Sequence, residues 1–437
     1  MTHSMTVPVS AAGGAARRLS GLPRLLPPGH GEREDLGAHL ARHGHAPHPG
    51  EALIATVAAA GLTGRGGAAF PMHRKLAILA GQRGSKAVVA NAAESEPASH
   101  KDKTLLHYAP HLVLDGLQLA AAAVGASQVY LYLHRGTATT HTIEAAIAER
   151  RAAGIDQREV LIAQAPPRFL AGQETAVANR IQGGPAVPTF GVPRVTERGI
   201  NGAPTLVQNA ETLAHLALVA RYGPDWFRSV GTAAEPGSML LTIHPAAGRP
   251  RVTEAEIGTP FQAVVPGPEP EPGTNAVLIG GYHGTWLRAA HAQRLTLDNA
   301  ALRSHGAALG AGVIAVLPAD SCGLREAARV TRYLAAESAG QCGPCLNGLP
   351  AIAGAMAELA GPRPRQQSID NVYRWAGLVT GRGACHHPDG TVRFVRSALE
   401  VFGEELRNHA RNQCAGTRAQ PFLPLPDAMP TTENEWR

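Results

Sequence analysis

The sequence is poor in cysteine and in aromatic residues, and it lacks long apolar runs. Five unevenly spaced cysteines in 437 residues are too few for a disulfide framework, so we expect a reducing, cytoplasmic compartment. No run of about 18 apolar residues occurs without a charge, so no transmembrane helix is predicted. The opening stretch MTHSMTVPVSAAGGAARRLSG has no apolar core, and no signal peptide is expected.

Blocks of like charge are also missing. The net charge is +6, but the basic residues are spread along the chain, so no nucleic-acid partner is predicted. What the chain does contain is glycine (49) and proline (34), which indicate many turns between short elements. The length predicts two to four domains.

The first part of the chain alternates between helical and strand patterns. Residues 1–50 read as an arm with a short helix, in which His43, His45 and His48 are interpreted as a solvated loop rather than a metal site. A helix that stops at Gly61 is followed by strands near 86–92, 127–133 and 159–165, with helices between them. This βαβ order predicts a parallel sheet with helices packed on it.

The pattern changes after about residue 235. Short β-like runs between Gly/Pro turns predict a small α+β module at 237–290, followed by a connector at 291–321. Helical patterns then dominate residues 322–416, and the Pro-rich tail at 417–437 is expected to be extended.

The stretch GLTGRGGAAFPMHRKL is a glycine-rich turn with cations and an aromatic beside it. Gly64, Gly66 and Gly67 would let backbone amides approach an anion without a Cβ in the way. Lys75 can reach a phosphate as a point charge, and Phe70 can stack on a flat ring. An ordinary turn is the alternative interpretation.

A second stretch, NAAESEPASHKDK, follows a predicted strand at the edge where parallel sheets bind ligands. Asn91 can pair with a polar ring edge. Glu94 and Glu96 lie two positions apart and face one side of an extended segment, which suits the hydroxyls of a ribose. A solvated acidic turn explains the same residues.

Two further stretches place polar side chains before helices. FLAGQETAVANRIQGG contains Glu174 and Thr175, and NGAPTLVQNAETLAHLA contains Thr205, Gln208 and Asn209. Helix capping is the competing interpretation of both.

In their order and their residues, these four stretches resemble the NADH-binding flavoprotein subunit of respiratory complex I. The same family includes the flavin subunits of NAD-reducing hydrogenases and NAD-dependent formate dehydrogenases, and the resemblance covers about residues 51–410. It implies an α/β fold with a Rossmann-like FMN/NADH-binding domain at 51–236 and a ubiquitin-like β-grasp (SLBB) module at 237–290. It also implies a helical iron–sulfur domain at 322–416.

The resemblance also implies roles for individual residues. Phe70 would lie beside NADH and, with Glu94, would serve the catalytic step. FMN and NADH would be bound by residues of all four stretches: Gly64, Arg65, Gly66, Gly67, Lys75, Asn91, Glu96, Gly172, Gln173, Glu174, Thr205, Gln208 and Asn209.

Three cysteines resemble the family's ligands of a [4Fe–4S] cluster. Cys342 and Cys345 form a C-x-x-C pair and Cys385 follows later, but Ala339 stands where the family has a fourth cysteine. Four accounts remain open: a cluster completed by His386, His387 or solvent, a [3Fe–4S] cluster, a Cys3His zinc site, or no metal. Cys322 and Cys414 are interpreted as structural thiols.

Other departures concern the nucleotide site. Ala93, Gln173 and Gln208 replace an aspartate, a glutamate and an asparagine of the family pattern. Fewer carboxylates weaken the case for NADH and open NADPH as an alternative, because less negative charge would repel a 2′-phosphate.

The resulting hypothesis is a divergent NADH dehydrogenase (diaphorase) that passes hydride from NADH to FMN and electrons to an iron–sulfur cluster. The expected partner is a ferredoxin-like or other iron–sulfur protein, with attachment to the inner face of a membrane only through partner subunits. Two alternatives are a non-catalytic assembly subunit and a metal-free flavin reductase.

Overall fold

The computed structural model describes residues 21–28, 33–189, 191–265, 276–414, 416–427 and 433–436. The expectations for residues 1–20, for 29–32 of the arm, for 266–275 of the α+β module and for 428–432 of the tail lie outside the described residues. Among the described residues, none of the helices is both long enough and apolar enough to cross a membrane.

The predicted parallel sheet is confirmed. Its four strands run in the order β3-β2-β1-β4, and every neighbouring pair is parallel. Ala87 lies opposite both Gln128 and Thr205, so the strands keep one register across the centre of the sheet. The strands are β1 (Ala87–Asn91), β2 (Gln128–His134), β3 (Val160–Ala165) and β4 (Thr205–Asn209).

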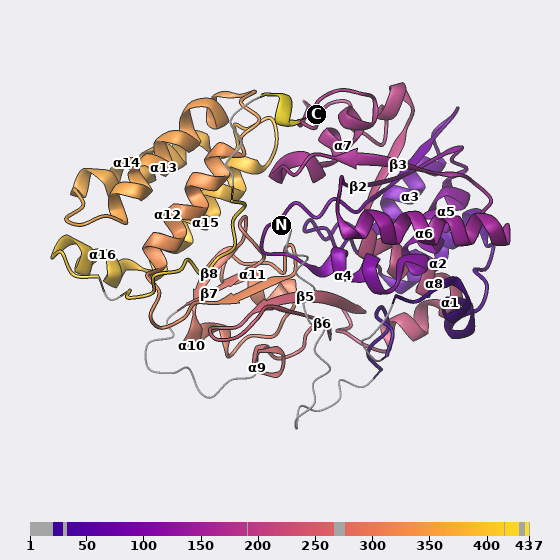
Figure 1. Cartoon of the computed structure of the whole chain (residues 1–437), viewed down its shortest axis with the longest axis horizontal. Coiled ribbons are helices and arrows are strands. Elements are labelled where there is room, and N and C mark those ends of the chain that lie inside the picture. Colours follow the sequence, from indigo (N-terminus) through magenta and orange to yellow (C-terminus); the bar gives the residue numbers. More distant parts are fainter. Residues whose placement is uncertain are drawn as a thin grey trace.

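Helices surround this sheet (Figure 1). The predicted end of a helix at Gly61 is confirmed, because this glycine adopts a left-handed conformation (φ 70°) directly after α2. Two long helices, α5 and α8, approach so closely at Gly116 that an added Cβ would lie 1.9 Å from the Leu213 carbonyl oxygen. The helices are α1 (Leu36–His43), α2 (Leu53–Ala60), α3 (Met72–Ala80), α4 (Lys101–Tyr108), α5 (Pro110–Val124), α6 (Ala138–Ala153), α7 (Glu174–Ile181) and α8 (Ala210–Arg228), with short 3₁₀ turns at Gly50–Ala52, Phe169–Gly172 and Ile200–Gly202.

A second sheet of five strands follows in the order β6-β5-β9-β7-β8. β5 and β9 are parallel and the other pairs are antiparallel. The central strand β9 comes from the segment expected to be a connector, so this sheet extends past residue 290. Its elements are β5 (Ser238–His244), β6 (Arg251–Glu256), α9 (Phe261–Val264), β7 (Ala276–Ile279), β8 (Thr285–Arg288), α10 (Ala289–Ala292), α11 (Asn299–Arg303) and β9 (Val313–Val316).

The C-terminal part is helical, as the sequence pattern predicts (orange and yellow in Figure 1). Apolar side chains such as Leu334, Met356 and Phe394 are fully buried between its helices and the second sheet. Its helices are α12 (Gly323–Ala336), α13 (Leu349–Leu359), α14 (Gln366–Val379), α15 (His387–Val401) and α16 (Gly403–Ala410), with a π turn at Pro344–Gly348 and a 3₁₀ turn at Glu433–Trp436.

Candidate functional site

Residues from all four motif stretches meet at the carboxyl ends of β1 and β4. Asn91 ends β1, Asn209 ends β4, and the two residues are partners in the sheet register. The Asn91 side chain donates a hydrogen bond of 2.8 Å to the Gly172 carbonyl oxygen. A Cβ added to Gly66 would lie 3.2 Å from the Cβ of Asn209, so the glycine loop packs directly on this edge. Segments far apart in sequence therefore share one site.

The glycine loop leaves bare backbone at the surface. Gly66 and Gly67 are exposed, and Gly67 has a φ of 111°, which disfavours any side chain. The amide of Gly64 donates to the Phe70 carbonyl oxygen at 2.9 Å and closes the loop. Phe70 itself is 37% exposed and leaves an apolar ring surface beside the loop, in front of α3.

The inner side of this loop has no room for a nucleotide. A pocket between the loop and the second sheet, lined by Gly64, Gly67, Met239 and Gly310 among others, has only about 20 Å³ of space. That is close to the volume that one water needs. A ligand of the loop would therefore bind on its exposed side.

Arg65 faces inward from the same loop. Its guanidinium donates to the carbonyl oxygens of Ser238 and Pro236 at 3.1 and 3.3 Å, and its amide donates to the Thr212 hydroxyl at 2.8 Å. The side chain is 3% exposed. Arg65 thus anchors the loop to the start of β5, and its guanidinium does not point to the exposed side.

Lys75 and Glu174, predicted from separate stretches, form an ion pair of 2.9 Å. Glu174 opens α7, where Gln173 is the cap: its side-chain oxygen accepts hydrogen bonds from the amides of Thr175 and Ala176 at 2.8 and 3.1 Å. The capping interpretation therefore holds for Gln173 rather than for Thr175. The amide in place of a carboxylate removes one charge beside the Lys75–Glu174 pair.

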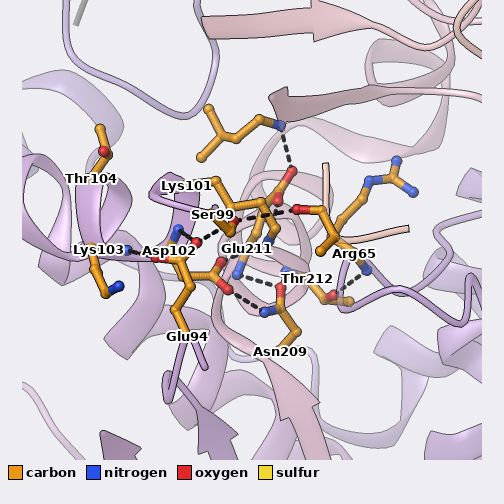
Figure 2. Close-up of polar contacts among 12 residues, drawn as sticks. Arg65, Glu94, Ser99, Lys101, Asp102, Lys103, Thr104, Asn209, Glu211 and Thr212 are labelled. Carbon is orange, nitrogen blue, oxygen red and sulfur yellow. Dashed lines mark hydrogen bonds and ion pairs between the residues drawn. The ribbon is translucent and has the colours of Figure 1, made fainter. Parts of the chain in front are cut away.

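Glu94 is buried beneath α4. Its carboxylate accepts hydrogen bonds from the amides of Asp102 and Lys103 at 3.1 and 3.0 Å and from the Ser99 hydroxyl at 2.6 Å. Burial opposes its charge, but Lys103 and Lys101 together with these donors hold the pKa of Glu94 below its ordinary value. Both oxygens are thus engaged in capping α4 (Figure 2).

Glu96 joins the first sheet to the second. Its carboxylate accepts a hydrogen bond of 2.8 Å from the Tyr282 amide, and a Cβ added to Gly281 would lie 2.6 Å from the carboxylate oxygen. Burial raises the pKa of Glu96 to about 7 despite this amide donor. In this structure the side chain faces the turn between β7 and β8.

A buried charged network below the site was not predicted from the sequence (Figure 2). Lys101 lies 2.9 Å from Asp102 and 2.8 Å from Glu211, and Asn209 donates to Asp102 at 2.7 Å. Burial raises the pKa of Asp102 to about 6, whereas burial of Glu211 is outweighed by Lys101, which lowers its pKa to about 2. The only signal was the HKDK sequence after the strand, because Glu211 is distant in sequence.

The last stretch is only partly at the site. Asn209 accepts from the amides of Glu211 and Thr212 and caps α8. Gln208 is buried one position earlier. Thr205 lies at the opposite, amino end of β4, where its hydroxyl donates to the Ala203 carbonyl oxygen at 2.9 Å and accepts from the Ile200 amide at 3.0 Å. The structure does not bring Thr205 to the shared edge.

The three predicted metal ligands interact with one another. Cys342 and Cys345 lie between α12 and α13, with Cys345 in the π turn, and Cys385 precedes α15. Burial, with the neighbouring sulfurs of Cys342 and Cys385, raises the pKa of Cys345 to about 12, and a hydrogen bond with Ser338 opposes this shift. The thiols of Cys342, Cys345 and Cys385, with the Ser338 hydroxyl beside Cys345, form a donor set that fits an iron–sulfur cluster. The fourth ligand position of such a cluster would then not be filled by a cysteine.

The two histidines proposed to complete the cluster differ in their surroundings. His387 is buried, with Nε2 2.8 Å from the Leu334 carbonyl oxygen and Nδ1 2.9 Å from Nε2 of His283, so both ring nitrogens are engaged. His386 has a fully exposed side chain. The structure thus argues against His387 as a ligand.

Two protein-family descriptions match the chain. The Nuo51 FMN-binding domain matches residues 57–218, and the NADH-ubiquinone oxidoreductase-F iron–sulfur binding region matches residues 325–409. Together they span more than half of the chain and contain every motif discussed above.

Relatives and solved structures agree with these matches. The chain is 28% identical to the F subunit of NADH-quinone oxidoreductase from Streptomyces coelicolor over 387 residues, covering 85% of each protein. It is 27% identical to the second F subunit of the same enzyme from Rhizobium meliloti, covering 82% of this chain and 88% of that protein. A chain of an NAD⁺-reducing [NiFe]-hydrogenase in the air-oxidized state is similar, with a TM-score of 0.76, 26% identity and 91% of this chain covered. The H2-reduced form gives a TM-score of 0.73, and this chain spans only 62% of that hydrogenase chain.

Proposed function

Because the chain belongs to the family of the F subunits of NADH-quinone oxidoreductase, we propose that it is an FMN-dependent NADH oxidoreductase that passes electrons to an iron–sulfur cluster. The observation that carries this proposal is the meeting of the glycine loop, Asn91, Gly172 and Asn209 at one edge of the parallel sheet. This edge is where open parallel sheets bind nucleotides. In the finer assignment, residues 51–236 form a Rossmann-like FMN/NADH domain, 237–290 an SLBB module and 322–416 the iron–sulfur domain.

The exposed backbone of Gly66 and Gly67 would hold the FMN phosphate, and Lys75 would add its positive charge. Arg65 would act at a distance, by fixing the loop to β5. The exposed ring of Phe70 offers a stacking surface for the nicotinamide. Hydride transfer itself needs no acid or base, so these residues act by positioning.

FMN, when bound, accepts hydride as an electron pair and releases the electrons singly, which is why a one-electron carrier must lie nearby. Cys342, Cys345 and Cys385 would hold that carrier. Ser338 would supply the fourth ligand, because its hydroxyl already contacts Cys345 and it directly precedes Ala339. His386 or solvent is the competing ligand.

The Ser338 assignment is tested with Ser338→Ala and His386→Ala in anaerobically purified protein. We expect Ser338→Ala to change the low-temperature EPR spectrum of the reduced cluster and to lower the iron content, whereas His386→Ala leaves both unchanged. The opposite pattern would move the fourth ligand to His386. Unchanged spectra in both variants would leave solvent in that position.

The electron acceptor is an iron–sulfur protein subunit, since the relatives named above are subunits of larger electron-transfer complexes. The chain would reach a membrane surface only through such partners. Whether NADPH replaces NADH depends on the charge that remains near Glu174, because Gln173 contributes none.

The enzyme assignment is tested by absorbance of the anaerobic protein. We expect a flavin spectrum that is bleached by NADH, and more slowly by NADPH, together with a broad iron–sulfur shoulder. A bound flavin that stays oxidised with both nucleotides would refute the enzyme assignment. Bleaching without the shoulder would leave a metal-free flavin reductase.

A non-catalytic assembly subunit is the second candidate. The carboxylates of Glu94 and Glu96 are engaged in capping α4 and in the contact with Tyr282, and Ala93 and Ala339 lack ligand atoms of the family pattern. The same spectroscopic titration distinguishes this candidate from the enzyme, because an assembly subunit would hold a flavin that NADH does not reduce.

A further inference from the structure

The two cysteines interpreted from the sequence as separate structural thiols lie in one polar cluster. Cys322 is the residue before α12, His409 lies in the last turn of α16, and Cys414 follows α16. The donor atoms of these three residues all lie within 4.8 Å of one another. Cys322 and His409 are buried, at 6% and 3% exposure. Three segments therefore converge on one point, where two donors are buried and Cys414 is partly buried.

A carboxylate lies beside this three-residue cluster, next to Cys322. Glu405 lies one helical turn before His409 on α16, and the two side chains therefore share a face. The distance from Cys322 Sγ to Glu405 Oε2 is 3.2 Å, and that from Cys322 Sγ to His409 Nε2 is 3.5 Å. Ligands of a tetrahedral zinc ion lie about 2.0–2.3 Å from the metal, which puts neighbouring sulfur and nitrogen ligands about 3.5 Å apart. The distance between Cys322 Sγ and His409 Nε2 is therefore that of two ligands of one metal ion.

The histidine is already in the form that a metal needs. His409 Nδ1 lies 3.2 Å from the Leu359 carbonyl oxygen, which can only accept, so Nδ1 carries the proton. Nε2 is left with its lone pair directed at Cys322. Metal-binding histidines usually donate their other ring nitrogen in this way. The Leu324 amide likewise holds the Glu405 carboxylate, at 3.1 Å.

We propose that Cys322, His409 and Cys414 bind a divalent zinc ion. An oxygen of water or of the adjacent Glu405 carboxylate would fill the fourth position. The role is structural, because the three ligands come from separate segments of the chain. The ion would fasten the chain beyond α16 to the start of α12. Backbone contacts already bring these two segments together, since the amides of Thr417 and Arg418 both donate to the Asp320 carbonyl oxygen at 2.9 Å.

This site is separate from the iron–sulfur ligands. Cys322 precedes α12, whereas Cys342 and Cys345 follow it, and the 14 residues of α12 span about 21 Å. The proposal therefore does not depend on the fourth cluster ligand or on turnover of NADH.

The test is metal analysis of the full-length protein, purified anaerobically without added metal. We expect about one zinc per chain in addition to iron. Cys414→Ser and His409→Ala should lose most of the zinc while keeping flavin and iron, and Cys342→Ser should lose iron while keeping zinc. His141→Ala is the matched control for the histidine change, because His141 is highly exposed on α6, and it should keep both metals.

Zinc X-ray absorption of the wild-type protein gives a second readout that needs no variant. We expect two sulfur ligands at about 2.3 Å and two lighter ligands. A shell with three sulfurs would place zinc at Cys342, Cys345 and Cys385 and overturn the proposal. Retention of zinc by both Cys414→Ser and His409→Ala, or a Cys322–Cys414 disulfide in the native protein, would overturn it as well.

Should the variants not fold, the wild-type protein still decides the question. A chelator should lower the thermal midpoint of the helical part, and zinc should restore it, because an ion that joins separate segments contributes to folding. A chelator that removes zinc without moving this midpoint would contradict the structural role.

Discussion

The Lys75 ammonium lies 2.9 Å from the Glu174 carboxylate, across 99 residues of sequence. Each was predicted to bind a different ligand, Lys75 the FMN phosphate and Glu174 the NADH. Their contact shows that the two predicted subsites adjoin. It also means that a bound phosphate would compete with Glu174 for the same cation.

The first prediction concerns this pair. Lys75→Gln should weaken FMN binding by about 10- to 100-fold, because it removes a charge-assisted hydrogen bond worth roughly 1.5–3 kcal/mol. The thermal midpoint should hardly change, since both side chains are partly exposed and such pairs contribute about 0–1 kcal/mol. Fluorescence titration of the flavin-free protein with FMN measures the affinity.

The matched control for Lys75→Gln is Arg151→Gln. Arg151, in the last turn of α6, pairs with Glu159 at 3.1 Å, and both side chains are highly exposed. Arg151→Gln should leave FMN binding unchanged. Equal losses in the two variants would mean that Lys75 acts only through the net charge of the protein.

The second prediction concerns Glu94. Glu94→Gln should destabilise the protein by about 2 kcal/mol, because an amide NH2 would face one of the backbone donors that cap α4. We expect the thermal midpoint to fall by about 5 °C at pH 7. Glu144→Gln, on the exposed face of α6, should leave it unchanged.

Acid should reduce the difference between Glu94→Gln and the wild type. The native pKa of Glu94 lies below its ordinary 4.5, so its contribution is present above that pH and is lost as the pH falls further. A wild-type advantage that grows on acidification would contradict the capping role. An effect on the KM for NADH without any loss of stability would instead support the catalytic assignment.

The sequence predicted the parallel sheet, because helix and strand periods alternate clearly from Glu51 to Ala165. It also predicted that the NAAESEP stretch follows a strand of this sheet at its carboxyl end, and Asn91 does end β1. It did not predict β9 as a central strand. Four apolar residues after a Gly-rich turn give no periodicity, and the pairing of β9 with β5 and β7 is set by distant segments.

Side-chain direction was the least predictable feature of the site. Arg65 and Thr205 belong to motif stretches, yet both side chains are buried and donate hydrogen bonds to backbone carbonyl oxygens. The Lys101–Glu211 pair joins positions 110 residues apart, and a single sequence holds no record of such contacts. The Cys322–His409–Cys414 cluster was missed for the same reason, because its spacing matches no short metal motif.

The third prediction is a pH dependence set by Glu96. Its pKa is raised by burial from 4.5 to about 7, so the native state holds its proton more tightly than the unfolded chain does. This contribution to stability is complete below about pH 4.5 and is lost as the pH rises through 7. Glu96→Gln, which stays neutral, should therefore gain stability relative to the wild type between pH 5 and 8. One pKa unit corresponds to about 1.4 kcal/mol, and partial exposure of the side chain keeps the gain below about 3 kcal/mol.

Unfolding curves of the wild type and Glu96→Gln at pH 5, 6, 7 and 8 measure this dependence. The Tyr282 amide can still bond to the Gln oxygen, so the comparison isolates the charge. Parallel stability curves would show that Glu96 titrates normally. A relative loss for Glu96→Gln at high pH would show that the ionised carboxylate stabilises the contact between the two sheets.

The fourth prediction separates backbone strain from ligand binding in the glycine loop. Gly67 has a φ of 111°, and the nearest atom to an added Cβ is 3.9 Å away, so Gly67→Ala meets strain rather than a clash. Such strain is worth about 1–3 kcal/mol.

Gly84, in the turn before β1, has a φ of 83° and open space around its Cβ, so Gly84→Ala carries similar strain at another turn. We expect similar falls in thermal midpoint for both variants, but a loss of FMN affinity of about tenfold or more only for Gly67→Ala. The added methyl group faces Gly310 on the inner side of the loop, and the strain shifts the exposed amides that would hold the phosphate. Equal FMN affinity in the two variants, measured by fluorescence titration, would remove the glycine loop from the flavin site.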